Sequence, residues 1–422
     1  MNIELIKKNY DEFKSELGRY NKMYSYYKGD TDTVNKYPKT DRSNLITPTN
    51  YIKKFIKEEI SYSVSNDITY ISKKGNEDVI NDIDYYLSVL DEDHDIDLFK
   101  NMLIYGLAYE IYFINQYNEF DCKAISPRIG RVIKDGLGNT IGFIHVFNRD
   151  DNEYIDFYDK DYIYHFDSSF NQVLNPTKHI FGCVPVGVAK ISEEEKDDTL
   201  YKDLKGLQDS LEQIQSDYVN EISDTRTAYL VLSGVELDEE NGAEDIKRKG
   251  IIQIPNGDGT AQFLIKNISP EFIKNAISNL DSKIFSIASH IDTNERMQSN
   301  TSSLALKTRL IAVDFKCKLN QKAMSNCIKT RLRCLFTHLR IMFNKNYDIR
   351  DIKIKFTSNI PADDLTTAQM IAQVGDKLST ETALSLFSFI TNPKNELAKI
   401  KAEQEYIIEG SNLLEEDDDL NE

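Results

Sequence analysis

The chain has 422 residues, 40% of them hydrophobic, and its formal net charge is −18. A chain of this length is expected to form about two or three domains with cores of their own. No run of about twenty apolar residues occurs, which excludes a helical membrane span, and the first residues lack the apolar core of a secretion signal. The acidic balance argues against a protein that coats nucleic acid over its whole surface, although it leaves room for a local basic zone.

Helical spacing of apolar residues predicts helices over residues 1–28, 51–62, 78–90 and 96–110. Asn50 or Thr49 is expected to cap the second helix, and a strand over residues 68–72 is expected before the third. The loop Asp91–Asp97 has carboxylates at alternate positions, as a calcium loop has, but it lacks the glycine and the glutamate of an EF-hand. We therefore interpret it as an acidic loop that leads into a helix N-terminus.

From residue 111 to about residue 191 the pattern is typical of β-structure, with strand-like runs at 110–115, 142–148, 153–159 and 162–167. The glycines between residues 136 and 142 lack the Lys-Ser/Thr pair of a phosphate-binding loop, so we expect a hairpin turn there. A helix over residues 199–227 follows. A small module of strands and turns over residues 229–268 separates it from a helix that begins at Ser269–Pro270 and ends near residue 290.

The stretch from Ser302 to about Lys345 reads as one long helix, because it has no proline or glycine and its apolar residues recur at helical spacing. It carries ten basic residues against Asp314 alone, a net charge of +9, which leaves −27 for the rest of the chain. A strongly basic helix in an acidic protein needs an acidic partner surface or a polyanion. A polar run without regular apolar pattern, residues 292–301, precedes this helix.

After the basic helix the sequence predicts a strand over residues 351–356 and short helices over residues 366–409, one of them capped by Ser379. Five cysteines form no metal-type pair and are expected to be buried small apolar residues in a reducing compartment: Cys122, Cys183, Cys317, Cys327 and Cys334. Neither the six histidines nor the carboxylates form a recognisable catalytic or metal motif. We therefore expect a structural or binding protein, not an enzyme, with no catalytic residue, metal or cofactor.

The order of these parts resembles the portal proteins of tailed bacteriophages, most closely those of long-tailed phages of Gram-positive bacteria. The likeness rests on an ordered set of stretches: residues 103–112, residues 181–185 with the acidic loop that follows, and residues 204–234, 358–361 and 378–382. The resemblance implies an α+β, ring-forming portal-type fold. Its parts would be a wing (1–198), a first stem helix (199–228), a β-containing clip (229–268), a second stem helix (269–291), a tunnel loop (292–301), a long wing helix (302–346), a wing strand (347–362), a short helical crown (363–410) and an acidic disordered tail (411–422).

The resemblance also implies a function. Portal subunits form a ring, usually of twelve copies, at one vertex of the phage head, and double-stranded DNA is packaged and ejected through it. The implied partners are other copies of the chain, the terminase, coat and scaffold proteins, and head-completion proteins, with no membrane. Assembly would take place in the cytoplasm of the host bacterium. Two alternatives are another head–tail connector of a phage-like particle and a nucleic-acid-processing enzyme that uses the basic helix.

Two groups of site residues follow from the resemblance and the charges together. The candidates for the DNA channel are Asp292, Asn294, Glu295, Arg296, Gln298, Ser299, Asn300, Lys307 and Arg309. The candidates for the subunit interface are Lys316, Lys322, Lys329, Arg331, Arg333, Arg340, Asp209 and Glu212. Each cation of the long helix could instead contact DNA, and both alternatives stay open at this point.

Overall fold

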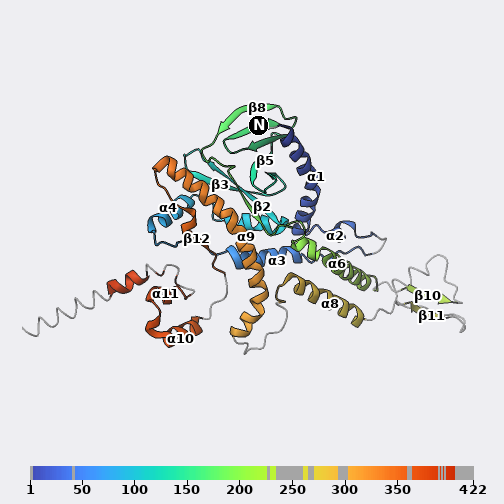
Figure 1. Ribbon diagram of the computed structural model, residues 1–422. Helices are drawn as coiled ribbons and strands as arrows, with labels where there is room; N and C mark the ends of the chain where they lie inside the picture. The colour runs from blue at the N-terminus through green and yellow to red at the C-terminus, as the bar shows by residue number, and fades with distance from the viewer. Residues whose placement is uncertain are drawn as a thin grey trace, which may run out of the picture. The chain divides into compact units, whose positions relative to one another are not determined.

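The computed structural model describes residues 3–39, 43–225, 229–233, 260–264, 270–292, 303–358, 364–387, 390, 393 and 396–403. These residues form helices and antiparallel sheets (Figure 1), which confirms the mixed α and β class. The chain divides into two compact units, residues 1–298 with 308–358, and residues 299–307 with 359–422. The second unit contains α10 (Asp364–Val374) and α11 (Thr380–Leu384), and Ser379 caps α11 as predicted by accepting a hydrogen bond from the Thr382 amide. The predicted acidic tail, residues 411–422, lies outside the described residues.

The first unit begins with helices close to those that the sequence predicts. They are α1 (Ile3–Lys28), α3 (Tyr51–Val64), α4 (Glu77–Leu87) and α5 (His94–Tyr105), and a short helix that the sequence does not predict, α2 (Asp32–Lys36), follows α1. Asn50 occupies the N-cap position of α3, but its side chain makes no capping hydrogen bond. The acidic loop leads into α5, as expected, and Asp95 and Asp97 lie in the first turn of that helix.

The predicted helix over residues 96–110 is too long at its C-terminal end. Gly106 has a φ of 76° and ends α5 at Tyr105, because the left-handed conformation that follows a helix is open to glycine without strain. The chain then enters β2 (Leu107–Ile114), which is the middle strand of a three-stranded sheet with β3 (Phe120–Ile125) and β9 (Val186–Lys190). A β-carbon on Gly106 would lie 2.1 Å from the carbonyl oxygen of Glu195, so the acidic loop before α6 packs directly on this turn.

A five-stranded meander follows in strand order β4 (Gly130–Lys134), β5 (Thr140–Arg149), β6 (Asn152–Tyr158), β7 (Tyr162–Asp167) and β8 (Gln172–Lys178). The glycines of residues 136–138 lie in the turn between β4 and β5, where Asp135 accepts from the amides of Leu137 and Asn139. The expected hairpin is therefore confirmed. A separate pair, β1 (Thr69–Ser72) and β12 (Ile352–Lys355), joins two segments that are distant in the sequence.

Two long helices pack side by side after the sheets, α6 (Leu200–Thr225) and α8 (Pro270–Ala288) (Figure 1). Between them in the sequence, β10 (Tyr229–Ser233) pairs with β11 (Thr260–Leu264). The rest of the predicted small module lies outside the described residues. The long helix is α9 (Ser303–Phe343), close to its predicted bounds.

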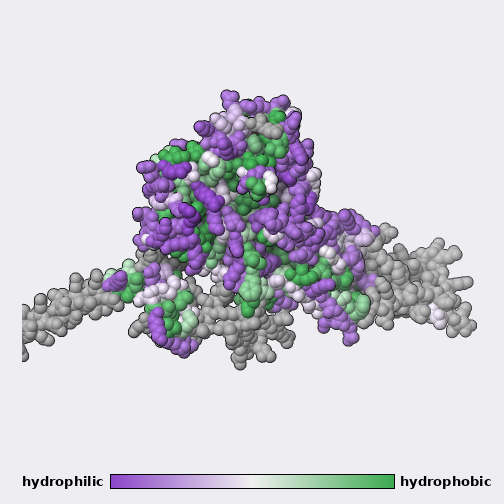
Figure 2. All heavy atoms as spheres, viewed as in Figure 1, coloured by the Kyte–Doolittle hydropathy of each residue, from purple (hydrophilic) through white to green (hydrophobic). Residues whose placement is uncertain are grey.

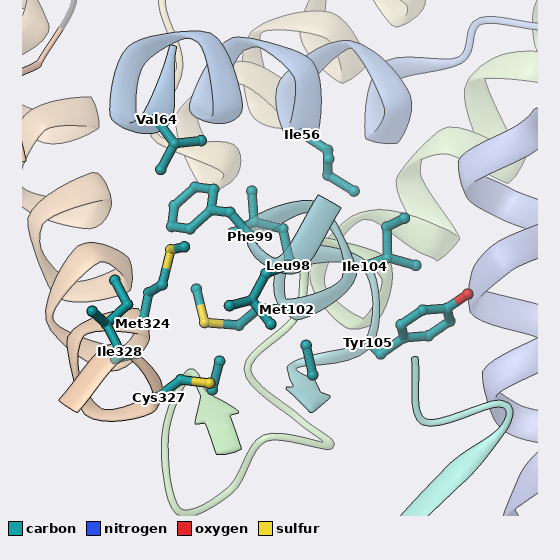
Figure 3. Close-up of a cluster of buried hydrophobic side chains, with 14 of the residues drawn as sticks. Ile56, Val64, Leu98, Phe99, Met102, Ile104, Tyr105, Met324, Cys327 and Ile328 are labelled. Atoms are coloured by element: carbon teal, nitrogen blue, oxygen red, sulfur yellow. The ribbon is translucent and has the colours of Figure 1, made fainter. Parts of the chain in front are cut away.

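The main core surrounds α5, in which every residue from Leu98 to Tyr105 except Lys100 and Asn101 is buried. Figure 3 shows Phe99 of α5 close to Val64 of α3 and to Met324 of α9, so α5 contributes to one core with both helices. Four of the five cysteines are buried as expected. The expectation is wrong for Cys183, which is exposed because the loop before β9 carries it at the surface.

The turn at Gly106 gives a first prediction. The change Gly106→Ala adds a strained backbone conformation and a clash with the Glu195 carbonyl, and we expect a loss of about 2–4 kcal/mol in the free energy of unfolding. Gly75 is a matched control, because its φ of 73° is similar and a β-carbon there meets no atom within 4 Å. We expect Gly75→Ala to cost about 1 kcal/mol. Denaturant unfolding measures both, and equal losses would contradict the role of the Glu195 contact.

Candidate functional site: the two faces of the long basic helix

The cations of α9 fall into two groups according to whether the chain itself neutralises them. Lys316 and Arg331 form ion pairs with carboxylates of other elements, and Lys318 pairs with Asp314 one turn earlier. Four further cations are exposed and have no ion pair within the part of the chain that the structure describes: Lys322, Lys329, Arg333 and Arg340. Lys316 and Arg331 lie on a different face of the helix from these four cations, whereas Lys318 lies beside them on the exposed face.

Arg331 lies in the interior, with a side chain that is 1% exposed. Its guanidinium donates to Glu110 of β2, with 2.9 Å between Nε and Oε1, and to Asp95 of α5. Glu110 is itself fully buried and also receives hydrogen bonds from His94 at 2.6 Å and from the Tyr112 hydroxyl at 2.9 Å. The cluster therefore joins α9 to β2 and α5 through a fully buried pair, Arg331 and Glu110, with Asp95 at its partly exposed edge.

The charge of Arg331 keeps Glu110 ionised in this interior. Burial alone would raise the pKa of Glu110, but Arg331 and His94 outweigh it and hold the pKa below its ordinary value. Such a pair is costly to break from one side, because the remaining charge is left without a partner in a medium that solvates it poorly. The prediction that Arg331 contacts a neighbouring subunit is therefore wrong, since its hydrogen bonds are made inside its own chain.

A second cluster lies nearer the start of α9. Lys316 pairs with Glu59 of α3 at 2.6 Å, and Glu59 also contacts His290, just beyond the end of α8, at 3.3 Å. Asn320 donates to the other oxygen of Glu59 at 3.0 Å. Burial lowers the pKa of His290, but its hydrogen bonds with Glu58 and Glu59 outweigh that effect and raise it. Lys316 thus serves to connect α3, α8 and α9, and its charge is already neutralised within the subunit.

The four unpaired cations form a stripe along the exposed face. At about 100° per residue, Lys322, Lys329, Arg333 and Arg340 lie within about 40° of one another around the helix axis. The stripe covers about 27 Å of helix length, at about 1.5 Å per residue. We call it the cationic stripe. Its like charges repel one another, so a partner with negative charge would stabilise it.

The same face is apolar toward the N-terminal end of α9. Ile311, Phe315 and Leu319 follow one another at one-turn spacing and are 44%, 63% and 69% exposed. Figure 2 shows hydrophobic surface over this part of α9. Large apolar side chains gathered on one exposed face are typical of a surface that another protein covers. We call this group the apolar stripe, and it continues into the cationic stripe at Lys322.

Asp209 and Glu212 of α6 also act within the chain. Glu212 is fully buried and accepts hydrogen bonds from Thr31, Gln208 and the backbone amide of Thr49. Asp209 accepts from the Tyr26 hydroxyl at 2.7 Å and from Lys205 at 2.7 Å. Further along α6, Ser216 and Asn220 bind backbone groups of Thr47 and Leu45.

Residues 31–37 and 45–49 are thus attached to one side of α6 by a series of side-chain hydrogen bonds. The interface prediction is wrong for Glu212, because a buried carboxylate with this set of donors cannot also reach a neighbouring subunit. Asp209 retains some exposure, but its oxygens are used by Tyr26 and Lys205.

The structure describes only some of the predicted channel residues. Asp292 is half-buried and is the last described residue before α9. Lys307 and Arg309 lie in the first turns of α9, where the structure describes the backbone but not the side chains. The remaining candidates lie outside the described residues: Asn294, Glu295, Arg296, Gln298, Ser299 and Asn300.

The described residues contain no group of three or more His, Cys, Asp or Glu side chains that could hold a metal ion. Among the same residues, no helix combines the length and the apolar composition needed to cross a membrane.

Comparison with known proteins identifies the family. Residues 6–410 match the family described as "Phage portal protein, SPP1 Gp6-like". The chain belongs to this family of phage portal proteins. It is 25% identical over 425 aligned residues to the portal protein of Bacillus phage SPP1, an alignment that covers 90% of this chain and 81% of that protein. The family places this portal subunit at the portal vertex of a phage virion, as part of the head–tail connector, and implies a structural role.

The fold of the portal subunit also resembles a solved structure of the neck of an empty gene transfer agent (GTA) particle. The TM-score is 0.50 with 9% sequence identity, and the alignment covers 79% of this chain and 89% of the other. At that identity the likeness concerns the fold alone.

Arg331 gives the prediction for this site. Arg331→Ala leaves Glu110 buried without its main cation, and we expect the free energy of unfolding to fall by about 3–5 kcal/mol. Arg333→Ala is the matched control, because it removes the same side chain from the exposed face two residues later and is expected to cost less than about 0.5 kcal/mol. Urea unfolding of the two variants checks this, and similar losses would show that the Glu110 pair does not hold α9 in place.

Proposed function

We propose that this portal subunit assembles into a ring, with twelve as the expected copy number, and that double-stranded DNA passes through the ring during packaging and ejection. Membership of the portal family supports the portal role. The observation that supports assembly most directly is the exposed face of α9, where the apolar stripe continues into the cationic stripe. A face of this kind is costly to leave in water and is suited to burial against a neighbour.

The expected partner surface is an acidic face of the next copy. Contacts around a ring are heterologous, so one face of a subunit meets a different face of the next one. The chain supplies both signs of charge, since its net charge is −18 while α9 carries unpaired cations. We therefore assign Lys322, Lys329, Arg333 and Arg340 to the subunit contact. Direct contact of these cations with DNA is the alternative outcome that the experiments below separate.

The parts of the subunit are proposed as follows. The wing would comprise residues 1–198, α9 and the strand β12 near its end. The packed helices α6 and α8 would form the stem, residues 229–268 the clip, residues 292–301 the tunnel loop and residues 363–410 the crown. The clip would meet the terminase and later the head-completion proteins, and the wing would meet coat and scaffold proteins. The pairing of α6 with α8 and of β10 with β11 supports the stem and clip assignments.

The tunnel loop must touch DNA without holding it, because strong phosphate binding would stop movement through the ring. The composition of residues 292–301 supports this role, with Arg296 as a single cation among Asp292, Glu295 and uncharged polar residues. Lys307 and Arg309, in the first turns of α9, are the further candidates for weak contact with DNA.

The cationic stripe is tested by charge reversal. Lys329→Glu with Arg333→Glu would place negative charge against the acidic neighbour, and we expect rings to give way to smaller species while the subunit stays folded. The control variant is Lys160→Glu with Lys178→Glu. Lys160 is exposed in the turn between β6 and β7, Lys178 is exposed at the end of β8, and the change in charge is the same but lies away from the stripe. Light scattering after size-exclusion chromatography measures the assembly.

If both double variants form rings but only the stripe variant loses DNA packaging, the result would show that these cations contact DNA and not the neighbouring subunit. If both double variants form rings and package DNA normally, the result would contradict the assignment of the stripe to the neighbouring subunit and also its assignment to DNA.

Deletion of Thr293–Ser299 tests the tunnel loop separately. We expect ring assembly to be unchanged, because the stripes on α9 and the cluster around Glu59 are kept, and DNA packaging to be impaired. Electron microscopy of the purified variant reports assembly, and the amount of nuclease-protected DNA in particles reports packaging. Normal packaging by the deletion variant would contradict the tunnel-loop assignment.

A further inference from the structure

Two free cysteines lie where the loop before β9 meets the C-terminal part of α9. The Sγ atoms of Cys183 and Cys334 lie 4.0 Å apart, although the residues are 151 positions apart in the sequence. Cys334 is fully buried, whereas Cys183 is exposed. One thiol is therefore open to a small reagent, and the second lies directly behind it.

The loop is held firmly over the helix on both sides of Cys183. Phe181 is 5% exposed and packs edge-on against the ring of Phe120, with 6.2 Å between the ring centroids. Val184 is 7% exposed, and Val186 begins the strand β9, which pairs with β2. Because neighbours on both sides of Cys183 are anchored in the core, the two sulfur atoms stay close in the folded chain.

The surroundings make Cys183 the more reactive of the two thiols. The hydrogen bond with Cys334 and the charge of Arg333 outweigh burial and lower the pKa of Cys183 to about 7. The pKa of Cys334 is raised well above its ordinary value by the same hydrogen bond and by burial. The lowered pKa increases the fraction of Cys183 that is present as thiolate, the form that attacks disulfides.

We propose that Cys183 and Cys334 form a thiol–disulfide site that reacts with low-molecular-weight disulfides such as oxidised glutathione. The Cys183 thiolate attacks one sulfur of the oxidant, which forms a mixed disulfide and releases one glutathione thiolate. Cys334 then loses its proton and attacks the Sγ of Cys183, which releases the second glutathione. The net reaction converts two protein thiols and one oxidised glutathione into one intramolecular disulfide and two reduced glutathiones.

The redox environment decides which form is present. A reducing cytoplasm keeps the pair as thiols, and an oxidising medium favours the disulfide. The bond would tie the loop before β9 to the helical turn next to Arg333, and so would restrain one segment of the cationic stripe. That consequence rests on the proposed ring contact, whereas the chemistry of the pair does not.

The test treats the folded, full-length chain with oxidised glutathione at neutral pH and maps its cysteines by mass spectrometry without reduction. We expect the wild-type chain to lose two thiols and to yield one cross-linked peptide that joins Cys183 to Cys334. The buried thiols of Cys122, Cys317 and Cys327 are internal controls and should stay free. Reduction with dithiothreitol should restore both thiols.

Three variants separate the steps of the reaction. Cys183→Ser should abolish the cross-link, Cys334→Ala should accumulate one glutathione on Cys183, and Cys327→Ala should cross-link as the wild type does. Three results would overturn the proposal: no loss of thiols in the folded wild-type chain, a stable glutathione adduct on Cys183 with Cys334 free, or a bond between any other two cysteines. Because this readout does not depend on ring formation, it can fail while the proposed function holds.

Discussion

The buried ion pair between Arg331 and Glu110 is the interaction on which the position of the long helix depends. An ion moved from water into a protein interior loses several kcal/mol of solvation, and only well-placed partners offset that loss. Asp95, His94 and Tyr112 complete the set of partners, so the guanidinium has one favourable position against β2 and α5. Apolar packing around α5 would tolerate small rotations of α9, whereas these directional hydrogen bonds do not.

The fixed rotation of α9 determines what the rest of the helix can do. Arg331 and Arg333 are two residues apart, which places them about 160° apart around the axis. With Arg331 locked inward, Arg333 and the other members of the cationic stripe must face outward, together with the apolar stripe that precedes them. The Glu59 cluster makes a second attachment closer to the region that leads from α8 into α9. One face of α9 thus packs inside its own subunit, while the opposite face is exposed and can contact a partner.

Sequence reasoning located the elements better than it located the contacts. Helical spacing and the absence of proline and glycine were enough to define α9, and Ser379 was predicted correctly as a cap because capping depends on local chemistry. The number of charges, however, does not show that Arg331 is buried while Arg333 is exposed. That difference depends on Glu110, which is 221 residues away in the sequence. The sequence pattern places Glu110 at the boundary between a helix over 96–110 and a strand-like run over 110–115, because it does not reveal the left-handed turn at Gly106 that puts Glu110 inside β2. The one available signal was a lone carboxylate within an otherwise apolar strand, Leu107–Ile114, which indicates a buried partner.

The central claim is that α9 holds its own subunit together through one face and joins the next subunit through the other. The most direct measurement is a cryo-electron microscopy reconstruction of the assembled chain at a resolution that shows side chains. The account predicts a closed ring in which Phe315 and Leu319 are covered by the adjacent copy and Lys329 and Arg333 lie within ion-pair distance of its carboxylates, with Arg331 still bound to Glu110. A ring in which this face of α9 remains open to solvent would contradict it.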